Sequence, residues 1–159
     1  MKLVNNLLDY NTPWSLPDVY LFTGNAMVRN DGAVVMGRGA AKQVRDTYPH
    51  VQYALGKKLF KNPITNLVFV QTGSQHTQLS LLPSQTNQWI GWFKVKYHWA
   101  EPADLDLIYE STSCLTGIAT KRPDITFHMN YPGVGNGRLT DADVAPLLSV
   151  LPDNVIIYR

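Results

Sequence analysis

Two glycine-rich loops could hold a phosphate-bearing ligand. One runs through residues 24–32 and 36–41 and the other through residues 132–139; each follows an apolar run and precedes a stretch with helical spacing. Glycine lets the backbone approach a ligand closely, and the N–H groups of a helix N-terminus bind anions. Because ligands of open α/β sheets lie beyond the carboxyl ends of the strands, two such loops facing one crevice would suit a diphosphate. The alternative is that these glycines only serve tight turns.

The spacing of the glycines excludes two common nucleotide-binding motifs. The chain has no G-x-x-x-x-G-K-[ST] phosphate loop, and neither glycine loop has the G-x-G-x-x-G spacing of a dinucleotide site. Metal chemistry is not indicated either, since His50, His76 and His128 lack ligand spacing and Cys114 is the single cysteine. We therefore expect no metal and no cofactor, and we expect Cys114 to be an inert core residue of a helix.

The elements that must position these loops follow from the apolar periodicity. Short apolar runs predict strands over residues 18–23, 66–71, 79–82, 125–129 and 154–158. Helical spacing predicts helices over residues 40–48, ended by Pro49, over residues 102–115, and after Thr140, where Asp143 would complete a capping box. Residues 84–99 fit a helix in one part and a strand in another. Strands alternating with helices predict an α/β fold, a three-layer α/β/α sandwich with a mixed, mostly parallel central sheet.

Length and composition set the broad class. The chain has 159 residues, 14 Lys and Arg against 12 Asp and Glu, and 16% charged residues, which excludes a polycation and a charged disordered tail. One domain over residues 1–159 is expected. No apolar run approaches the ~20 residues of a membrane span, and the polar N-terminus does not fit a secretory signal. We expect a cytoplasmic monomer that does not contact a membrane.

Nearly the whole chain resembles the macrodomains, a family that binds ADP-ribose. Residues 5–9 look like the opening G-D/N-L-L-D segment, and residues 36–41 with Tyr48-Pro49 are similar to the M-G-x-G-I-A…F/Y-P pattern. Residues 133–139 look like the G-x-G-x-G-G-L loop of the DarG-like and ADP-ribose-1''-phosphatase-like branches. Residues 93–99 resemble the F-P-T-K-x-H-W segment of the DarG-like branch, keeping its Phe, Lys, His and Trp.

This resemblance implies roles for individual residues. Diphosphate and distal ribose would lie between two sets of loop residues: Gly133, Val134, Gly135, Asn136, Gly137 and Arg138 on one side, and Met36, Gly37, Arg38 and Gly39 on the other. Asn25 and Asn30 would bind the distal ribose, and Asn6 stands where macrodomains usually carry the Asp that binds adenine. Lys96 would be the catalytic amine, with Asn25 as a second catalytic candidate. Asp31 is a third candidate from its position near the distal-ribose loop, where it could orient a water molecule or simply be a solvated carboxylate.

The chemistry of Lys96 depends on its surroundings. A lysine is a useful nucleophile only where desolvation or a neighbouring cation lowers its pKa. Trp89, Trp92, Phe93 and Trp99 would supply an apolar wall if they surround Lys96. The alternative is a surface lysine held by cation–π attraction. His98 could serve as an acid or base, but we expect it to pack against Trp99. The polar stretch of residues 71–88 could read the substrate, but we expect a plain surface loop.

Three functions are compatible with the sequence. The first is a hydrolase that removes ADP-ribose from a nucleic acid or protein, or the phosphate from ADP-ribose-1''-phosphate. The second is a binding module that reads ADP-ribose without turnover, favoured by Asn6 and by Gly137, where the Lys-dependent human-type glycohydrolase has an Asp. In the third, a patch of Arg29, Arg38, Lys94, Lys96 and Arg138 would hold modified DNA or RNA. The expected partner is ADP-ribose or an ADP-ribosylated substrate, and a phage or bacterial origin would suit such an accessory protein.

Overall fold

A mixed β-sheet forms the middle layer of the molecule. The computed structural model describes residues 1–73, 79–80 and 88–159, and within them seven strands pair in the order β1-β7-β6-β2-β5-β3-β4. Their bounds are β1 Lys2–Val4, β2 Val19–Asn25, β3 Leu67–Gln71, β4 Leu79–Ser80, β5 Trp89–Lys96, β6 Phe127–Asn130 and β7 Val155–Tyr158. The pairs from β1 to β5 are parallel, and β3 runs antiparallel to both β5 and β4. The predicted mixed, mostly parallel sheet is confirmed.

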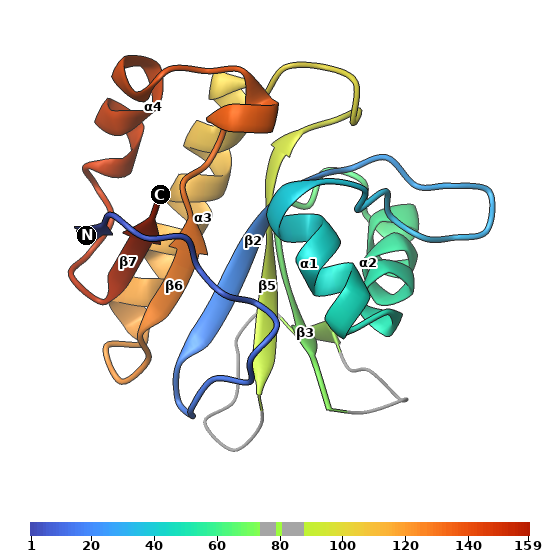
Figure 1. Ribbon diagram of the computed structural model, residues 1–159, viewed down its shortest axis with the longest axis horizontal. Helices are drawn as coiled ribbons and strands as arrows, with labels where there is room; N and C mark the ends of the chain where they lie inside the picture. The colour runs from blue at the N-terminus through green and yellow to red at the C-terminus, as the bar shows by residue number, and fades with distance from the viewer. Residues whose placement is uncertain (74–78, 81–87) are drawn as a thin grey trace.

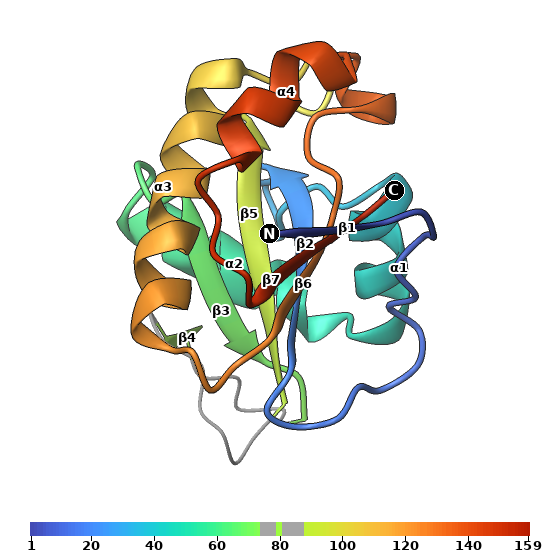
Figure 2. The ribbon, with the colours of Figure 1, turned by 90° about the vertical axis from the view of Figure 1, so that its left-hand side faces the viewer.

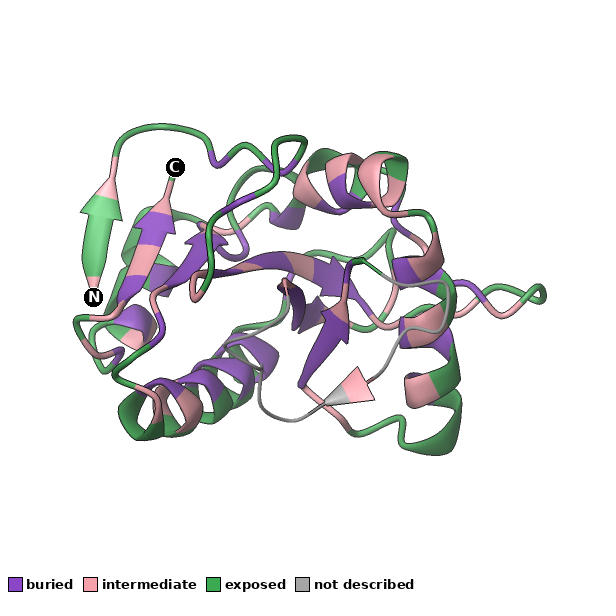
Figure 3. Ribbon diagram, turned by 90° about the horizontal axis from the view of Figure 1, so that it is seen from below, coloured by how far each residue is buried: buried purple, intermediate pink, exposed green. Residues whose placement is uncertain are grey.

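Helices cover both faces of this sheet. Helices α1 (Gly39–Thr47) and α2 (His50–Lys61) lie on one face, and α3 (Leu105–Lys121) and α4 (Asp141–Leu148) lie on the other (Figures 1 and 2). Two apolar clusters fill the layers between sheet and helices, one with Val44, Leu55 and Trp92 and the other with Phe93, Leu115 and Val144. Figure 3 shows the central strands as a buried band and β1 as an exposed edge. The three-layer α/β/α sandwich is therefore as predicted.

Several elements differ from the sequence-based prediction. Pro49 does end the predicted helix, but it also stands at the start of α2, which the periodicity did not indicate. The ambiguous residues 84–99 contain β5, which pairs with β2 and β3. Its seven residues before Lys96 are all buried, because the apolar clusters between sheet and helices cover both of its faces. The strand predicted over residues 79–82 is described only as Leu79–Ser80, and most of the polar stretch before β5 lies outside the described residues.

The prediction for Cys114 is wrong. Its side chain is exposed, because the buried stripe of α3 runs through Leu107, Ile108, Ser111 and Leu115 and leaves position 114 on the solvent side. Cys114 is therefore not a core residue of α3. Among the described residues, no helix combines the length and hydropathy that a membrane span requires.

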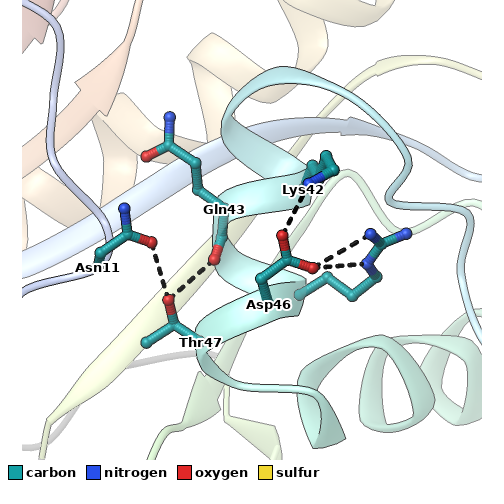
Figure 4. A network of polar contacts seen from close by, with 6 residues as sticks. Asn11, Lys42, Gln43, Asp46 and Thr47 are labelled. Atoms are coloured by element: carbon teal, nitrogen blue, oxygen red, sulfur yellow. Dashed lines mark hydrogen bonds and ion pairs between the residues drawn. The ribbon is translucent and has the colours of Figure 1, made fainter.

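A polar network ties α1 to the N-terminal segment. The Thr47 hydroxyl lies 3.0 Å from both Asn11 Oδ1 and the carbonyl oxygen of Gln43, while Lys42 donates to Asp46 at 2.9 Å (Figure 4). The Asn11 contact links the last residue of α1 to the N-terminal segment, whereas the other two bonds lie within α1. Gly39 begins the same helix at its opposite end and lies next to the second glycine loop.

The predicted capping box at the start of α4 is confirmed. Thr140 accepts from the Asp143 N–H at 3.3 Å, and the Asp143 carboxylate accepts from the Thr140 N–H at 3.2 Å. We expect Thr140→Ala to lower the free energy of unfolding by about 1 kcal/mol, because it removes the hydroxyl of the capping box and leaves the Asp143 N–H with the Thr140 carbonyl oxygen as its acceptor. Urea unfolding of this variant beside Thr120→Ala, which removes an exposed hydroxyl bonded within α3, measures the difference; equal stabilities would contradict a stabilising cap.

Candidate functional site

A cavity of about 660 Å³ opens beyond the carboxyl ends of three neighbouring parallel strands, β2, β5 and β6. Its lining comes from those strand ends, the segment that leads into α1 with the first turn of that helix, the connection from β5 to α3 and the loop that follows β6. The residues are Thr23, Gly24, Asn25, Val35, Gly37, Arg38, Gly39, Ala40, Ala41, Val95, Lys96, Trp99, Ala100, Asn130, Gly133, Val134, Gly135, Asn136, Gly137 and Arg138. Crevices at this edge of an α/β sheet are its usual ligand sites, and the volume suits a nucleotide-sized ligand.

The two glycine loops meet across this cavity. Gly39 has a φ of +57°, and a Cβ built there would lie 3.1 Å from the Asn136 side-chain nitrogen. Glycine adopts this positive φ without strain, and a side chain at this position would press on Asn136. The structure thus brings together residues 37–39 and 133–138, as the sequence predicted for loops that face one crevice.

The first turn of α1 places its N–H groups on the cavity wall. Gly39, Ala40 and Ala41 all line the cavity, and the preceding Arg38 offers no side-chain cap to their N–H groups. The first N–H groups of a helix have no intrahelical acceptor, and the helix dipole adds partial positive charge there. With the cationic side chains of Arg38, Arg138 and Lys96 along the same cavity, the site favours an anionic ligand.

Lys96, the last residue of β5, lies half-buried in the cavity wall. Its ammonium donates to three backbone carbonyl oxygens, those of Trp99 at 3.2 Å, Glu101 at 3.2 Å and Asn136 at 3.4 Å. Burial lowers the pKa of Lys96, and the nearby cations Arg138 and Arg38 lower it further, against the opposing charge of Glu101. The structure therefore supplies both of the influences that could activate a lysine.

The aromatic residues near Lys96 are divided between core and cavity. Trp89, Trp92 and Phe93 are buried within β5, whereas Trp99 lines the cavity and is 52% exposed. The predicted packing of His98 on Trp99 is confirmed, with ring centroids 5.3 Å apart. A cation–π contact does exist nearby, but it places Lys94, not Lys96, over Tyr97. The aromatic wall around Lys96 thus consists of Trp99 alone among the described aromatic residues.

Asn25 lines the cavity, but its polar atoms hold the chain that follows. Its side-chain nitrogen donates to the Val35 carbonyl, and its Oδ1 accepts from the Met27 N–H, both at 3.0 Å. These bonds close the base of a hairpin over residues 27–35, which projects past α2 in Figure 1. One N–H of the amide and one lone pair of its Oδ1 remain, and Asn25 could bind a ribose through either of them.

Four predicted site residues lie outside the lining of the cavity. Met36 is buried in the apolar cluster between sheet, α1 and α2, because its side chain points away from the glycine loop. Asn30 and Asp31 occupy the exposed tip of the hairpin, where Asp31 pairs with Arg29 at 2.7 Å and accepts from the Ala33 N–H. The Arg29 contact lowers the pKa of Asp31. Asn6 is exposed in the segment after β1.

The structure also adds cavity residues that the sequence did not indicate. Asn130, at the end of β6, accepts from the Thr23 N–H at 3.0 Å and donates to the Thr23 hydroxyl at 2.8 Å. The Tyr10 hydroxyl lies 3.1 Å from Asn130 Oδ1 and completes this network. Asn130 directly precedes the second glycine loop in the sequence, and that position was the available signal.

Close packing against Ala103 explains why position 137 is a glycine. A Cβ at this position would lie 2.9 Å from the Ala103 Cβ, and the Gly137 carbonyl accepts from the Ala103 N–H at 2.8 Å. The loop therefore lies directly on the segment before α3 and leaves no room for a larger side chain. An Asp at position 137 is excluded unless this contact opens.

Comparisons with known proteins agree with this geometry. No family model and no curated protein matches the chain. Among solved structures, the macrodomain of Mycobacterium tuberculosis DarG is 26% identical, with a TM-score of 0.72 over 99% of this chain and 97% of that one. The macrodomain of Thermus aquaticus DarG is 20% identical, with a TM-score of 0.71 over 99% of this chain and 95% of that one. Thermosipho africanus DarTG in complex with ADP-ribose is 21% identical, with a TM-score of 0.68 over 88% of this chain and 37% of that one.

Proposed function

We propose that this chain, whose fold is that of the macrodomains, binds ADP-ribose in the cavity and releases it from an ADP-ribosylated substrate. This proposal is supported by one observation: two facing glycine loops, the N-terminus of α1 and a half-buried lysine all line the same cavity. The similar DarTG structure holds ADP-ribose, which supports the choice of ligand. The phosphates would lie at α1 and residues 133–138, where the donors and cations are concentrated.

Lys96 is the group best placed for the chemistry. As a neutral amine, it would form a bond to C1'' of the distal ribose while the bond to the linked group breaks. The linked group keeps that electron pair and takes up a proton, and water then cleaves the new carbon–nitrogen bond to return ADP-ribose and the amine. The linked group could be a nucleic-acid base, a protein side chain or, for ADP-ribose-1''-phosphate, phosphate, and each substrate would be tested separately.

A binding module without turnover is the second candidate. It is favoured by the same lysine, since all three N–H groups of the ammonium are already bonded to carbonyl oxygens. A lysine held in this form has no lone pair for attack. Binding and turnover must therefore be measured independently.

Calorimetric titration with ADP-ribose, with AMP as the control ligand, tests the proposed site. Gly37→Leu is expected to weaken ADP-ribose binding by at least about 30-fold, since a side chain there would project into the cavity and displace the ligand. Gly37 suits this test because its φ is not positive and a Cβ meets nothing within 4 Å, so the fold should be unaffected.

Gly117→Leu is the matched control for this prediction. Gly117 is exposed on α3, outside the cavity lining, and a Cβ there also meets open space. It should bind ADP-ribose like the unchanged protein. If ADP-ribose does not bind at millimolar concentration, or if both variants bind it equally well, the cavity is not the ADP-ribose site.

A further inference from the structure

The surroundings of Lys96 are unusual for a reactive amine. Its three acceptors come from two different segments, with Trp99 and Glu101 in the connection from β5 to α3 and Asn136 in the second glycine loop. All three are backbone carbonyl oxygens, and we call them the carbonyl cage. An ammonium has three N–H donors and no acceptor, so this cage uses each of them.

The carbonyl cage distinguishes the two protonation states of Lys96. A neutral amine has only two N–H groups and a lone pair, so one of the three carbonyl oxygens would face that lone pair without a proton between them. The cage therefore favours the ammonium form of Lys96, whereas burial and the positive charges of Arg138 and Arg38 favour the neutral amine. The negative charge of Glu101 favours the ammonium as well.

Other contacts hold the cage closed. Arg138 donates to the Ala100 carbonyl at 2.6 Å, and the Ala103 N–H donates to the Gly137 carbonyl at 2.8 Å. Both bonds join the β5–α3 connection to the second glycine loop, the same two segments that supply the carbonyl cage. The cage can open only if these segments separate or the Lys96 side chain turns away from them.

We propose that Lys96 is stored as a caged ammonium in the free protein and is released when a ligand occupies the cavity. This inference rests on the proposed function. One carbonyl of the cage belongs to Asn136, and residues 133–138 form the loop on which the diphosphate and ribose would lie. A ligand on this loop competes with the cage for position, and the loss of even one carbonyl frees a direction for the lone pair. The released ammonium would pass its proton to solvent water at the cavity, and the neutral amine would thus become reactive only after ADP-ribose is seated.

Heteronuclear NMR of lysine side chains tests both halves of this inference. In protein labelled with ¹⁵N-lysine, an ammonium signal appears only where hydrogen bonds slow proton exchange with water. We expect such a signal for Lys96 in the free protein, assigned by its loss in Lys96→Met. We expect saturation with ADP-ribose to remove it.

Two other lysines serve as internal controls. Lys94 is buried with its ammonium bonded to the carbonyls of Pro63 and Thr65, so its signal should persist in both states. Lys57 is exposed and has no ion pair among the described residues, so it should give no signal. A visible Lys94 without Lys96 in the free protein would overturn the cage. A Lys96 signal unchanged at saturation would overturn the release step.

The failure of the proposed function would be recognised separately. If calorimetry detects no binding of ADP-ribose, the proposed function and the release step are both contradicted. The carbonyl cage itself is decided by the spectrum of the free protein, which requires no ligand and no activity.

Discussion

Lys96→Met is expected to reduce hydrolysis of an ADP-ribosylated substrate by at least about 100-fold, the lower end of what a positioned proton-transferring or nucleophilic side chain contributes. Methionine keeps the length and apolar stem of the side chain and removes only its amine. The effect is measured as the single-turnover rate on three substrates: an ADP-ribosylated oligonucleotide, an ADP-ribosylated protein and ADP-ribose-1''-phosphate. Comparison of the three also identifies the linked group.

The same substitution should have a smaller effect on binding. Lys96 bonds to both segments of the carbonyl cage, so its loss loosens the cavity wall by hydrogen bonds of about 1 kcal/mol each. We therefore expect ADP-ribose affinity to fall by less than about 10-fold. Lys57→Met, at an exposed lysine outside the cavity, controls for the loss of a positive charge. Turnover that survives in Lys96→Met would show that the lysine mechanism is wrong.

Gly56→Ala is expected to be the most destabilising of the single substitutions considered. A Cβ at Gly56 on α2 would lie 1.8 Å from the carbonyl oxygen of Gly32, which is backbone and cannot move alone. Either α2 or the hairpin of residues 27–35 must shift. Overpacking of this kind costs about 3 kcal/mol, and urea unfolding measures it as a lower free energy of unfolding.

Gly56→Ala should also weaken binding in the cavity. The base of the hairpin is held by Asn25, which bonds to Val35 and Met27 and lines the cavity itself. A displaced hairpin would therefore weaken ADP-ribose binding, although Gly56 does not line the site. Gly117→Ala in the exposed middle of α3 is the control, expected to raise the free energy of unfolding by about 0.5–1 kcal/mol. If Gly56→Ala is as stable as the unchanged protein, the close packing of α2 on the hairpin is not real.

The layers of the fold were predictable from local patterns. Strands such as β2 and β6 are short apolar runs, and the cap of α4 is visible as Thr140 and Asp143. Helix α2 was missed because Pro49 looks like a stop signal, although proline is also tolerated at a helix start. Strand β5 was ambiguous because burial on both faces removes the alternation that marks a half-buried strand.

The parts of the site formed by backbone could be predicted from the sequence better than the parts formed by side chains. Gly37, Gly39 and Gly135 line the cavity as their positions after strands implied. Asp31 and Met36 belong to the same predicted glycine loop, yet neither lines the cavity. Asp31 is exposed at the tip of the hairpin, and Met36 is buried in the apolar core. Asn130 could be suspected from its position before the second glycine loop, but its contact with Thr23 and the contact of Lys96 with Asn136 have no local signal, because each joins segments that are far apart in the chain.

The pairing of β1 with β7 has a consequence for folding. These strands join the first and last residues of the chain, with Arg159 donating to the Val4 carbonyl at 3.1 Å. Closing so long a loop carries a large entropy cost, and β1 adds only three residues at an exposed edge. We expect β1 to dock last and its amide hydrogens to exchange early. Because no residue that lines the cavity lies on β1 or β7, opening of this edge would leave the cavity intact.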